Sequence, residues 1–297
     1  MKELFRKNLG QSRYERLARL KGLILNPGRA PATVTRWLVR RHAAPRVMLD
    51  VKNSINLVER MDYERGDIFL NVDSECEFSL RTNSCKKEPD TVNWIETFIK
   101  EGDVLFDIGA NVGAYSLVAA KFFNGKVKVY AFEPAIFNFS QLCRNIQLNK
   151  SQDTIVPLAL ALSDETTIGQ FNYHNQIPGG SLHTFGKAID HVGNVFEPEY
   201  VQPMLSFRID DLIEQFKVPV PNHIKIDVDG IELSVLRGAD RTLANPVVRS
   251  VLVELEQGES EQAITAFLQS KGFKLNSKYT RLTPGMLNCI FLREHVK

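Results

Sequence analysis

The sequence of 297 residues lacks the features that mark several large classes of protein. Its four cysteines are widely spaced and form no Cys-x-x-Cys pair, which argues against a zinc ribbon and against a disulfide scaffold. No apolar run approaches the roughly 20 residues that a membrane-spanning helix needs. Basic residues interrupt the N-terminal region too often for a secretory signal. We therefore expect a cytoplasmic protein with reduced cysteines.

Charge of one sign is also not in excess. The chain carries 37 Lys and Arg against 35 Asp and Glu, so we expect no nucleic-acid partner that binds through a broad basic surface. Residues 1–50, however, hold 12 Lys and Arg against 3 Asp and Glu, and Leu4 to Leu25 has the pattern of a basic amphipathic helix. We prefer a helix packed on the body of the protein; the alternative is peripheral contact with a membrane or another anionic partner.

The pattern of apolar residues predicts an α/β fold. Alternation between Asp67 and Arg81, about a turn at Asp73-Ser74-Glu75, predicts a β-hairpin. From Asp103 onward short apolar strands alternate with helices, which predicts a doubly wound, mostly parallel sheet with helices on both faces. The last two strands have no helix between them, so one should run antiparallel. The predicted strands are 104–108, 127–132, 155–161, 168–173, 224–228, 251–255, 274–278 and 289–292.

The strand at 104–108 leads into a glycine turn, Asp107-Ile108-Gly109-Ala110-Asn111-Val112-Gly113. In doubly wound sheets ligands bind beyond the carboxyl ends of the strands. The dinucleotide fingerprint Gly-x-Gly-x-x-Gly would need glycines where Asn111 and Ala114 stand, which argues against a nicotinamide dehydrogenase. Asp107 would repel a pyrophosphate and attract a cationic group, such as the α-ammonium of S-adenosylmethionine (AdoMet).

A second acid, Glu133, closes the next strand and can accept hydrogen bonds from ribose hydroxyls. Ser163 and Asp164 follow the third strand. The candidate cofactor-binding residues are therefore Asp107, Gly109, Asn111, Gly113, Glu133, Ser163 and Asp164.

On these residues the sequence resembles the class I AdoMet-dependent methyltransferases, and more closely the FkbM-type methyltransferase family. The resemblance is carried by residues 104–113, by Ala131-Phe132-Glu133-Pro134 and above all by Ile224-Lys225-Ile226-Asp227-Val228-Asp229-Gly230-Ile231-Glu232. It covers about residues 88–292. It implies a Rossmann-like fold with a seven-stranded sheet, AdoMet as methyl donor, and a hydroxyl acceptor on a saccharide or another small natural product.

The resemblance also divides the chain. Residues 1–87 form an N-terminal extension with the basic helix and the hairpin, and residues 88–297 form the methyltransferase domain. Within it, residues 173–203 exceed the ~12–15 residues of an idle loop, so we expect them to bind substrate or act as a lid. The oligomeric state is not indicated.

Candidate catalytic residues come from two places. Asp227 ends the strand beside the first and can face the transferred methyl. Asp229 and Glu232 either bind substrate or cap the following helix. Some related O-methyltransferases hold Mg²⁺ with acids at this strand end; Mg²⁺ is compatible with these residues, but we expect no metal site.

The insertion contains Pro178-Gly179-Gly180-Ser181-Leu182-His183, which also resembles the family. His183 is our first candidate for the base that removes a hydroxyl proton, and His174 the second. Alternatively, His183 only fixes the loop by hydrogen bonding. Ser181 is a candidate for binding the acceptor. Among other functions, a non-catalytic AdoMet-binding or scaffold protein remains an alternative, though the intact acids Asp107, Glu133 and Asp227 argue against it.

Overall fold

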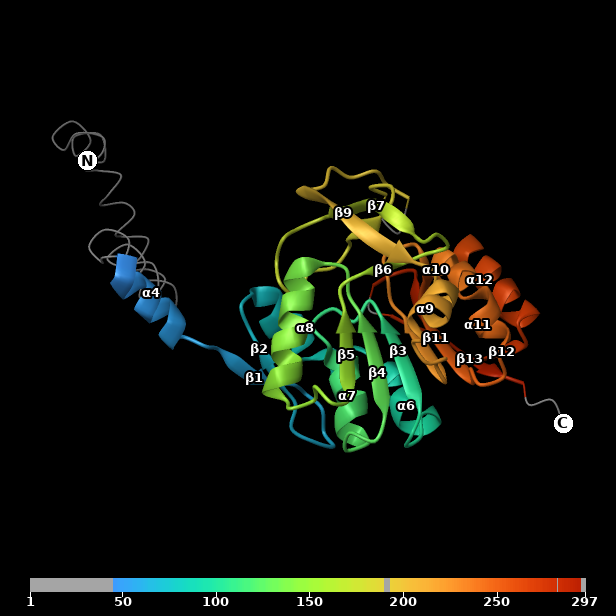
Figure 1. Cartoon of the computed structure of the whole chain (residues 1–297), viewed down its shortest axis with the longest axis horizontal. Coiled ribbons are helices and arrows are strands. Elements are labelled where there is room, and N and C mark those ends of the chain that lie inside the picture. The colour runs from blue at the N-terminus through green and yellow to red at the C-terminus, as the bar shows by residue number, and fades with distance from the viewer. Residues whose placement is uncertain (1–44, 190–192, 282, 295–297) are drawn as a thin grey trace, which may run out of the picture. The chain divides into compact units, whose positions relative to one another are not determined.

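The computed structural model describes residues 45–189, 193–281 and 283–294 (Figure 1). The chain divides into two units, Met1–Asn56 and Leu57–Lys297. In the first, the described residues form helix α4 (Pro45–Ser54). The basic helix predicted for Leu4 to Leu25 lies outside the described residues. No described helix is long and apolar enough to cross a membrane.

The second unit is built on a seven-stranded sheet with the order β12-β13-β11-β10-β3-β4-β5. β13 runs antiparallel to both β11 and β12, and the other neighbours are parallel. The doubly wound, mostly parallel sheet with an antiparallel last strand is thus confirmed, and this strand, β13, lies between β12 and β11. The strands are β3 (Val104–Ile108), β4 (Lys128–Phe132), β5 (Ile155–Leu158), β10 (His223–Ile226), β11 (Ser250–Glu256), β12 (Phe273–Thr280) and β13 (Met286–Arg293).

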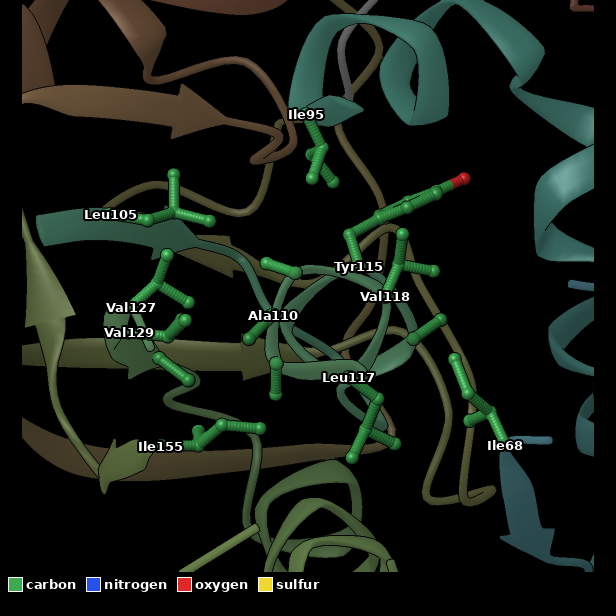
Figure 2. Close-up of a cluster of buried hydrophobic side chains, with 14 of the residues drawn as sticks. Ile68, Ile95, Leu105, Ala110, Tyr115, Leu117, Val118, Val127, Val129 and Ile155 are labelled. Carbon is green, nitrogen blue, oxygen red and sulfur yellow. The ribbon is translucent and has the colours of Figure 1, made fainter. Parts of the chain in front are cut away.

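Two hydrophobic clusters cover the two faces of this sheet. Adjacent residues of one strand belong to different clusters: Leu105 to the first and Phe106 to the second. Strands buried on both faces are nearly continuous apolar runs in the sequence, which is why these runs located them. Figure 2 shows the first cluster around Leu105, Val118 and Val129. Its helices are α6 (Pro89–Phe98), α7 (Ala114–Phe122) and α8 (Ile136–Leu148); those of the second are α9 (Ile209–Phe216), α10 (Glu232–Gly238), α11 (Asp240–Ala244) and α12 (Glu259–Ser270).

A second, four-stranded sheet was not expected from the sequence. It lies beyond the arrowheads of β3, β4 and β5 in Figure 1 and has the order β6-β9-β7-β8. The single strand predicted at 155–161 ends at Leu158, and the chain enters the second sheet at Ala161, opposite Ser206. Periodicity cannot detect a pairing between such distant residues. The strands are β6 (Ala161–Leu162), β7 (Thr167–Tyr173), β8 (Thr184–Phe185) and β9 (Tyr200–Phe207).

The hairpin predicted between residues 67 and 81 is wrong in its second strand. β2 (Phe69–Asn71) pairs antiparallel with β1 (Val58–Arg60), which precedes it in the chain. In place of the second strand, η1 (Glu77–Arg81) is a turn of π-helix, followed by α5 (Ser84–Lys87). Ser74 Oγ accepts the N–H of Glu77, and Glu77 Oε2 accepts the N–H of Asp73. The Ser-x-x-Glu sequence at residues 74–77 is a helix-start signal, and here it overrides the alternation. Residues 57–87 belong to the same unit as the sheet.

Candidate active site

A pocket opens at the carboxyl ends of β3, β4 and β10. The strand order reverses between β3 and β10, so the pocket lies at the switch point where such sheets bind ligands. Of the predicted site residues, its lining includes Gly109, Asn111, Glu133, Ser181, His183, Asp227 and Asp229. The lining does not include Asp107, Gly113, Ser163, Asp164 or Glu232.

The glycine turn after β3 brings the ends of three strands together. Gly109 has φ +78°, and a Cβ there would lie 1.9 Å from the backbone oxygen of Asp227, so only glycine fits. Asn111 has φ 52°, in the left-handed region that Asn tolerates. Its N–H donates to Glu133 Oε2 at 2.7 Å, and the N–H of Ala135 donates to Glu133 Oε1 at 2.9 Å. The turn of β3 therefore holds the acid of β4 in place.

These groups fit the ribose of AdoMet. A carboxylate oxygen has more than one lone pair, so Glu133 can accept ribose hydroxyls while it keeps its backbone donors. Asn111 Oδ1 is buried and has no hydrogen-bond partner among the described residues, so a ligand hydroxyl could supply the missing donor. Burial raises the pKa of Glu133 to about 7. The carboxyl group of Glu133 therefore changes charge near neutral pH.

Two of the predicted cofactor-binding acids, Asp107 and Asp164, do not line the pocket. Asp107 accepts a hydrogen bond from Ser116 Oγ at 2.6 Å, and its other oxygen lies 3.6 Å from Lys225 Nζ. The hydroxyl of Ser163 donates to Asp164, and a Cβ on Gly238 of α10 would lie 2.0 Å from the Ser163 backbone oxygen. Backbone packing thus holds Ser163. The wall at this point is formed instead by the apolar residues Leu160, Ala161 and Leu162.

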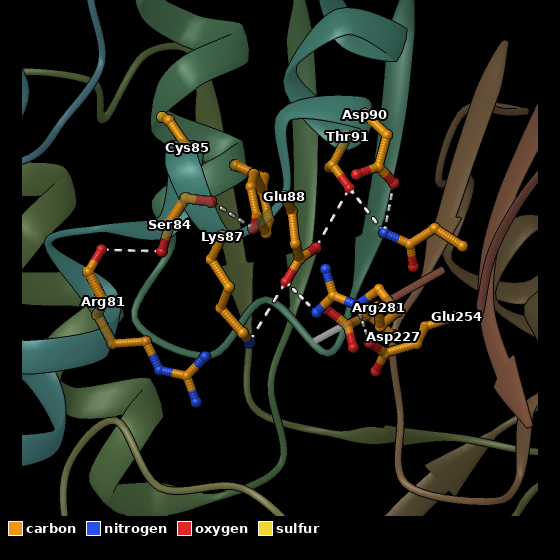
Figure 3. A network of polar contacts seen from close by, with 12 residues as sticks. Arg81, Ser84, Cys85, Lys87, Glu88, Asp90, Thr91, Asp227, Glu254 and Arg281 are labelled. Atoms are coloured by element: carbon orange, nitrogen blue, oxygen red, sulfur yellow. Dashed lines mark hydrogen bonds and ion pairs between the residues drawn. The ribbon is translucent and has the colours of Figure 1, made fainter. Parts of the chain in front are cut away.

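Asp227 belongs to a buried network of acids and bases (Figure 3). Lys225 Nζ donates to Asp227 Oδ2 at 2.8 Å. Arg281 Nε donates to Glu254 Oε1 at 2.7 Å, and its Nη2 donates to Glu88 Oε1 at 2.5 Å. Glu254 hydrogen-bonds to Asp227. Two cations thus hold three carboxyl groups, of which those of Asp227 and Glu254 line the pocket.

The charges within this network are unequal. Burial and the charge of Asp227 raise the pKa of Glu254 well above its usual range, so that Glu254 keeps its proton and donates a hydrogen bond to Asp227. Burial by itself would raise the pKa of Asp227. The Lys225 charge and the hydrogen bond from Glu254 outweigh burial and hold this pKa well below its usual range. Asp227 is therefore the ionised member of the pair at neutral pH.

The sequence did not identify every member of this network. Glu254 of β11 lines the pocket, whereas Glu256 of the same strand does not. Arg281 lies in the connection between β12 and β13, and Glu88 directly precedes α6. Neither belongs to a motif, so no sequence signal pointed to them. Within the described residues, no group of three or more His, Cys, Asp or Glu side chains is arranged to hold a metal ion.

His183 lines the pocket with its ring packed against Phe171 and Tyr173. Its Nδ1 accepts the backbone N–H of His174 at 3.3 Å, which assigns the proton of the neutral ring to Nε2. Burial, with the charges of His174 and Arg81, lowers the pKa of His183 to about 4. A neutral ring with Nε2–H donates a hydrogen bond. This geometry favours hydrogen bonding over proton removal as the role of His183, and its contact with His174 holds the loop.

The remaining predicted residues, Asp229 and Glu232, lie near the start of α10, and only one of them lines the pocket. Asp229 lines the pocket, whereas Glu232 is buried and its Oε1 accepts the N–H of Gly230 at 3.0 Å. Burial raises the pKa of Glu232 to about 8. Glu232 thus stabilises the turn before α10 and stays outside the pocket lining.

The chain is similar to known methyltransferases. Residues 107–275 match the methyltransferase FkbM domain family. The hexuronic acid methyltransferase AglP of Haloferax volcanii is 28% identical over 203 residues, which are 68% of this chain and 75% of that protein. The 31-O-demethyl-FK506 methyltransferase FkbM of Streptomyces tacrolimicus is 26% identical over 213 residues, 63% of this chain and 78% of that protein.

Among solved structures, methyltransferase FkbM from Methylobacillus flagellatus KT has a TM-score of 0.47 and 16% identity, covering 66% of this chain and 45% of that chain. The match to the domain family confirms the resemblance seen in the sequence. Because it spans more than half of the chain and includes the ends of β3, β4 and β10 that form the pocket, the chain belongs to the FkbM family of methyltransferases.

Proposed function

We propose that the protein transfers the methyl group of AdoMet to a hydroxyl oxygen of a saccharide or another natural product. The observation that carries this proposal is Glu133, a buried carboxylate held by two backbone N–H groups at the end of β4. It lies beside the glycine turn of β3 and lines the pocket. The relatives support the acceptor class, since their names specify a hexuronic acid and 31-O-demethyl-FK506.

Donor binding uses the turn after β3, the end of β4 and the stretch that follows β5. Glu133 and Asn111 Oδ1 accept the ribose hydroxyls, and the apolar stretch Leu160 to Leu162 provides a surface for the adenine ring. The ionised Asp227 places a negative charge at the end of β10, which favours a cationic ligand. AdoMet supplies an electrophilic methyl group on its sulfonium.

In the reaction the acceptor oxygen attacks the methyl carbon while the carbon–sulfur bond breaks, and the electron pair of that bond stays on sulfur. The acceptor proton becomes strongly acidic as the new carbon–oxygen bond forms, so a carboxylate suffices as base. We assign this role to Asp227 and the orientation of the acceptor oxygen to His183 Nε2–H. Alignment of the two substrates can supply ~7–11 kcal/mol of the barrier, and a positioned base a factor of about 10²–10⁴.

The proposal is tested by calorimetric titration with S-adenosylhomocysteine and by transfer of labelled methyl from AdoMet. The acceptors are a panel of saccharides and natural-product alcohols, with mass spectrometry of the products. Glu133→Gln should weaken binding of S-adenosylhomocysteine at least about tenfold, because it removes a charged acceptor. Glu101→Gln, at an exposed position before β3, is the matched control. Equal binding by both variants would refute the role of Glu133. A protein that binds S-adenosylhomocysteine but never transfers methyl would support the scaffold alternative.

A further inference from the structure

Arg81 brings a positive charge into the pocket from outside the family match. It ends η1, whereas the match begins at residue 107. Its Nε and Nη2 both donate to the backbone oxygen of Gly179, at 2.8 and 2.6 Å. A guanidinium has five N–H donors, so three remain for other partners. In the described part of the chain, Arg81 forms no ion pair with a carboxylate, although it lines the pocket and is half-buried.

The guanidinium lies near both sides of the pocket. Burial raises the pKa of Glu133, and the Arg81 charge lowers it. Burial lowers the pKa of His183, and the Arg81 charge lowers it further. It is therefore within electrostatic reach of the proposed ribose-binding acid and of the proposed acceptor-orienting ring. Through Gly179 it is also fixed to the loop that presents Ser181. This places an uncompensated cation on the acceptor side.

Lys87, the last residue of α5, adds a second cation to the same pocket. Its Nζ lies 3.4 Å from Glu88 Oε1, an oxygen that Arg281 already holds at 2.5 Å. An ammonium has three donors, so this single long contact leaves most of its capacity unused. Figure 3 shows the side chains of Arg81 and Lys87 extending in the same direction from neighbouring turns. Two cations with unused donors attract an anionic group.

We propose that Arg81 and Lys87 form a subsite for an anionic group, a carboxylate in the first instance, on the methyl acceptor. The inference rests on the proposed function, and it narrows the acceptor to acidic saccharides or acidic natural products. A planar guanidinium suits a carboxylate, and the point charge of an ammonium adds attraction without demanding a direction.

The test compares p-nitrophenyl β-D-glucuronide with p-nitrophenyl β-D-glucoside, which differ only in a carboxylate replaced by a hydroxymethyl group. Calorimetry on the full chain saturated with S-adenosylhomocysteine should show the glucuronide binding at least about tenfold more tightly. Arg81→Gln should abolish this preference, and Lys87→Gln should reduce it about threefold or more. Lys86→Gln changes the exposed neighbour outside the pocket lining and should leave the preference intact.

Because Arg81 also holds Gly179, the Lys87 variant keeps the test valid if Arg81→Gln disturbs the loop. Equal affinity for the two glycosides, or no binding of either, overturns the inference. If both variants instead weaken S-adenosylhomocysteine at least tenfold, the cations hold the carboxylate of the donor, which also overturns it. Failure of the unaltered protein to bind S-adenosylhomocysteine would instead contradict the proposed function, so the two failures are distinguishable.

Discussion

The two walls of the pocket are built in different ways. On the donor wall, the turn after β3, the end of β4 and the end of β10 are neighbours because their strands pair in register, Asp107 opposite both Ala131 and Lys225. On the acceptor wall, the loop at Gly179 and Gly180 is held by Arg81, Asn111 and Asn138 through contacts that span 98, 69 and 42 residues. The donor wall thus depends on the sheet, and the acceptor wall on side chains joining three separate segments.

The largest effect should come from the buried cation of the donor wall. Lys225 is 2% exposed and neutralises Asp107 and Asp227. Lys225→Met should lower the free energy of unfolding by about 3–5 kcal/mol, because it leaves two buried carboxylates uncompensated. Lys87→Met on the other wall should cost less than about 1 kcal/mol, since its ion pair is long and partly exposed. Urea unfolding measures both, and equal losses would contradict the distinction between the walls.

Next in size is the loss of the proposed base. Asp227→Asn should lower kcat by about 10²–10⁴-fold while binding of S-adenosylhomocysteine changes little. His183→Gln, on the acceptor wall, should cost about tenfold, as for an orienting hydrogen bond. Because the pKa of Asp227 is held well below its usual range, kcat should be flat between about pH 5 and 8.

The pH profile also separates the competing bases. If His183 is the base, the rate should fall as the pH drops through about 4, where its ring becomes protonated, and should be lost in His183→Gln. A rate that rises into the alkaline range and becomes flat in Glu254→Gln would assign it to Glu254, whose pKa is raised by burial and by the Asp227 charge.

A smaller effect concerns the acid of the donor wall. The pKa of Glu133 is raised by burial to about 7, so the carboxyl is mostly protonated at pH 6 and ionised at pH 8. If the ionised form binds the ribose, affinity for S-adenosylhomocysteine should rise by about tenfold between these pH values. Glu133→Gln should remove this dependence. An unchanged slope in the variant would show that another group titrates.

The smallest expected effect concerns the segment that carries Arg81. Ser74 Oγ accepts the N–H of Glu77 and donates to the backbone oxygen of Pro178 at 2.6 Å. Ser74→Ala should lower the free energy of unfolding by about 1 kcal/mol, as for other helix-start caps. It should also weaken acceptor binding more than donor binding, because the loop at Pro178 belongs to the acceptor wall. Ser79→Ala, at an exposed position of η1, is the control.

Much of the donor wall could be predicted from the sequence. Strands buried on both faces are continuous apolar runs, and the glycine turn and the acids come directly after them, so local patterns located β3, β4 and β10 with Gly109, Glu133 and Asp227. The division of the chain at residue 87 remains a prediction, as do the cytoplasmic location and the role of the basic N-terminal helix.

Only the tertiary structure decided the rest. The second sheet pairs Ala161 with Ser206. The pocket receives Arg281 from the connection between β12 and β13 and Arg81 from the end of η1, and neither segment carries a motif. The capping pair at Ser74 competed with an alternation that looked equally regular. Local sequence determines which residues can form a strand or a turn, because those preferences act over a few residues. Which carboxyl keeps its proton, and which cation stays unpaired, depends on burial and on neighbours distant in the chain.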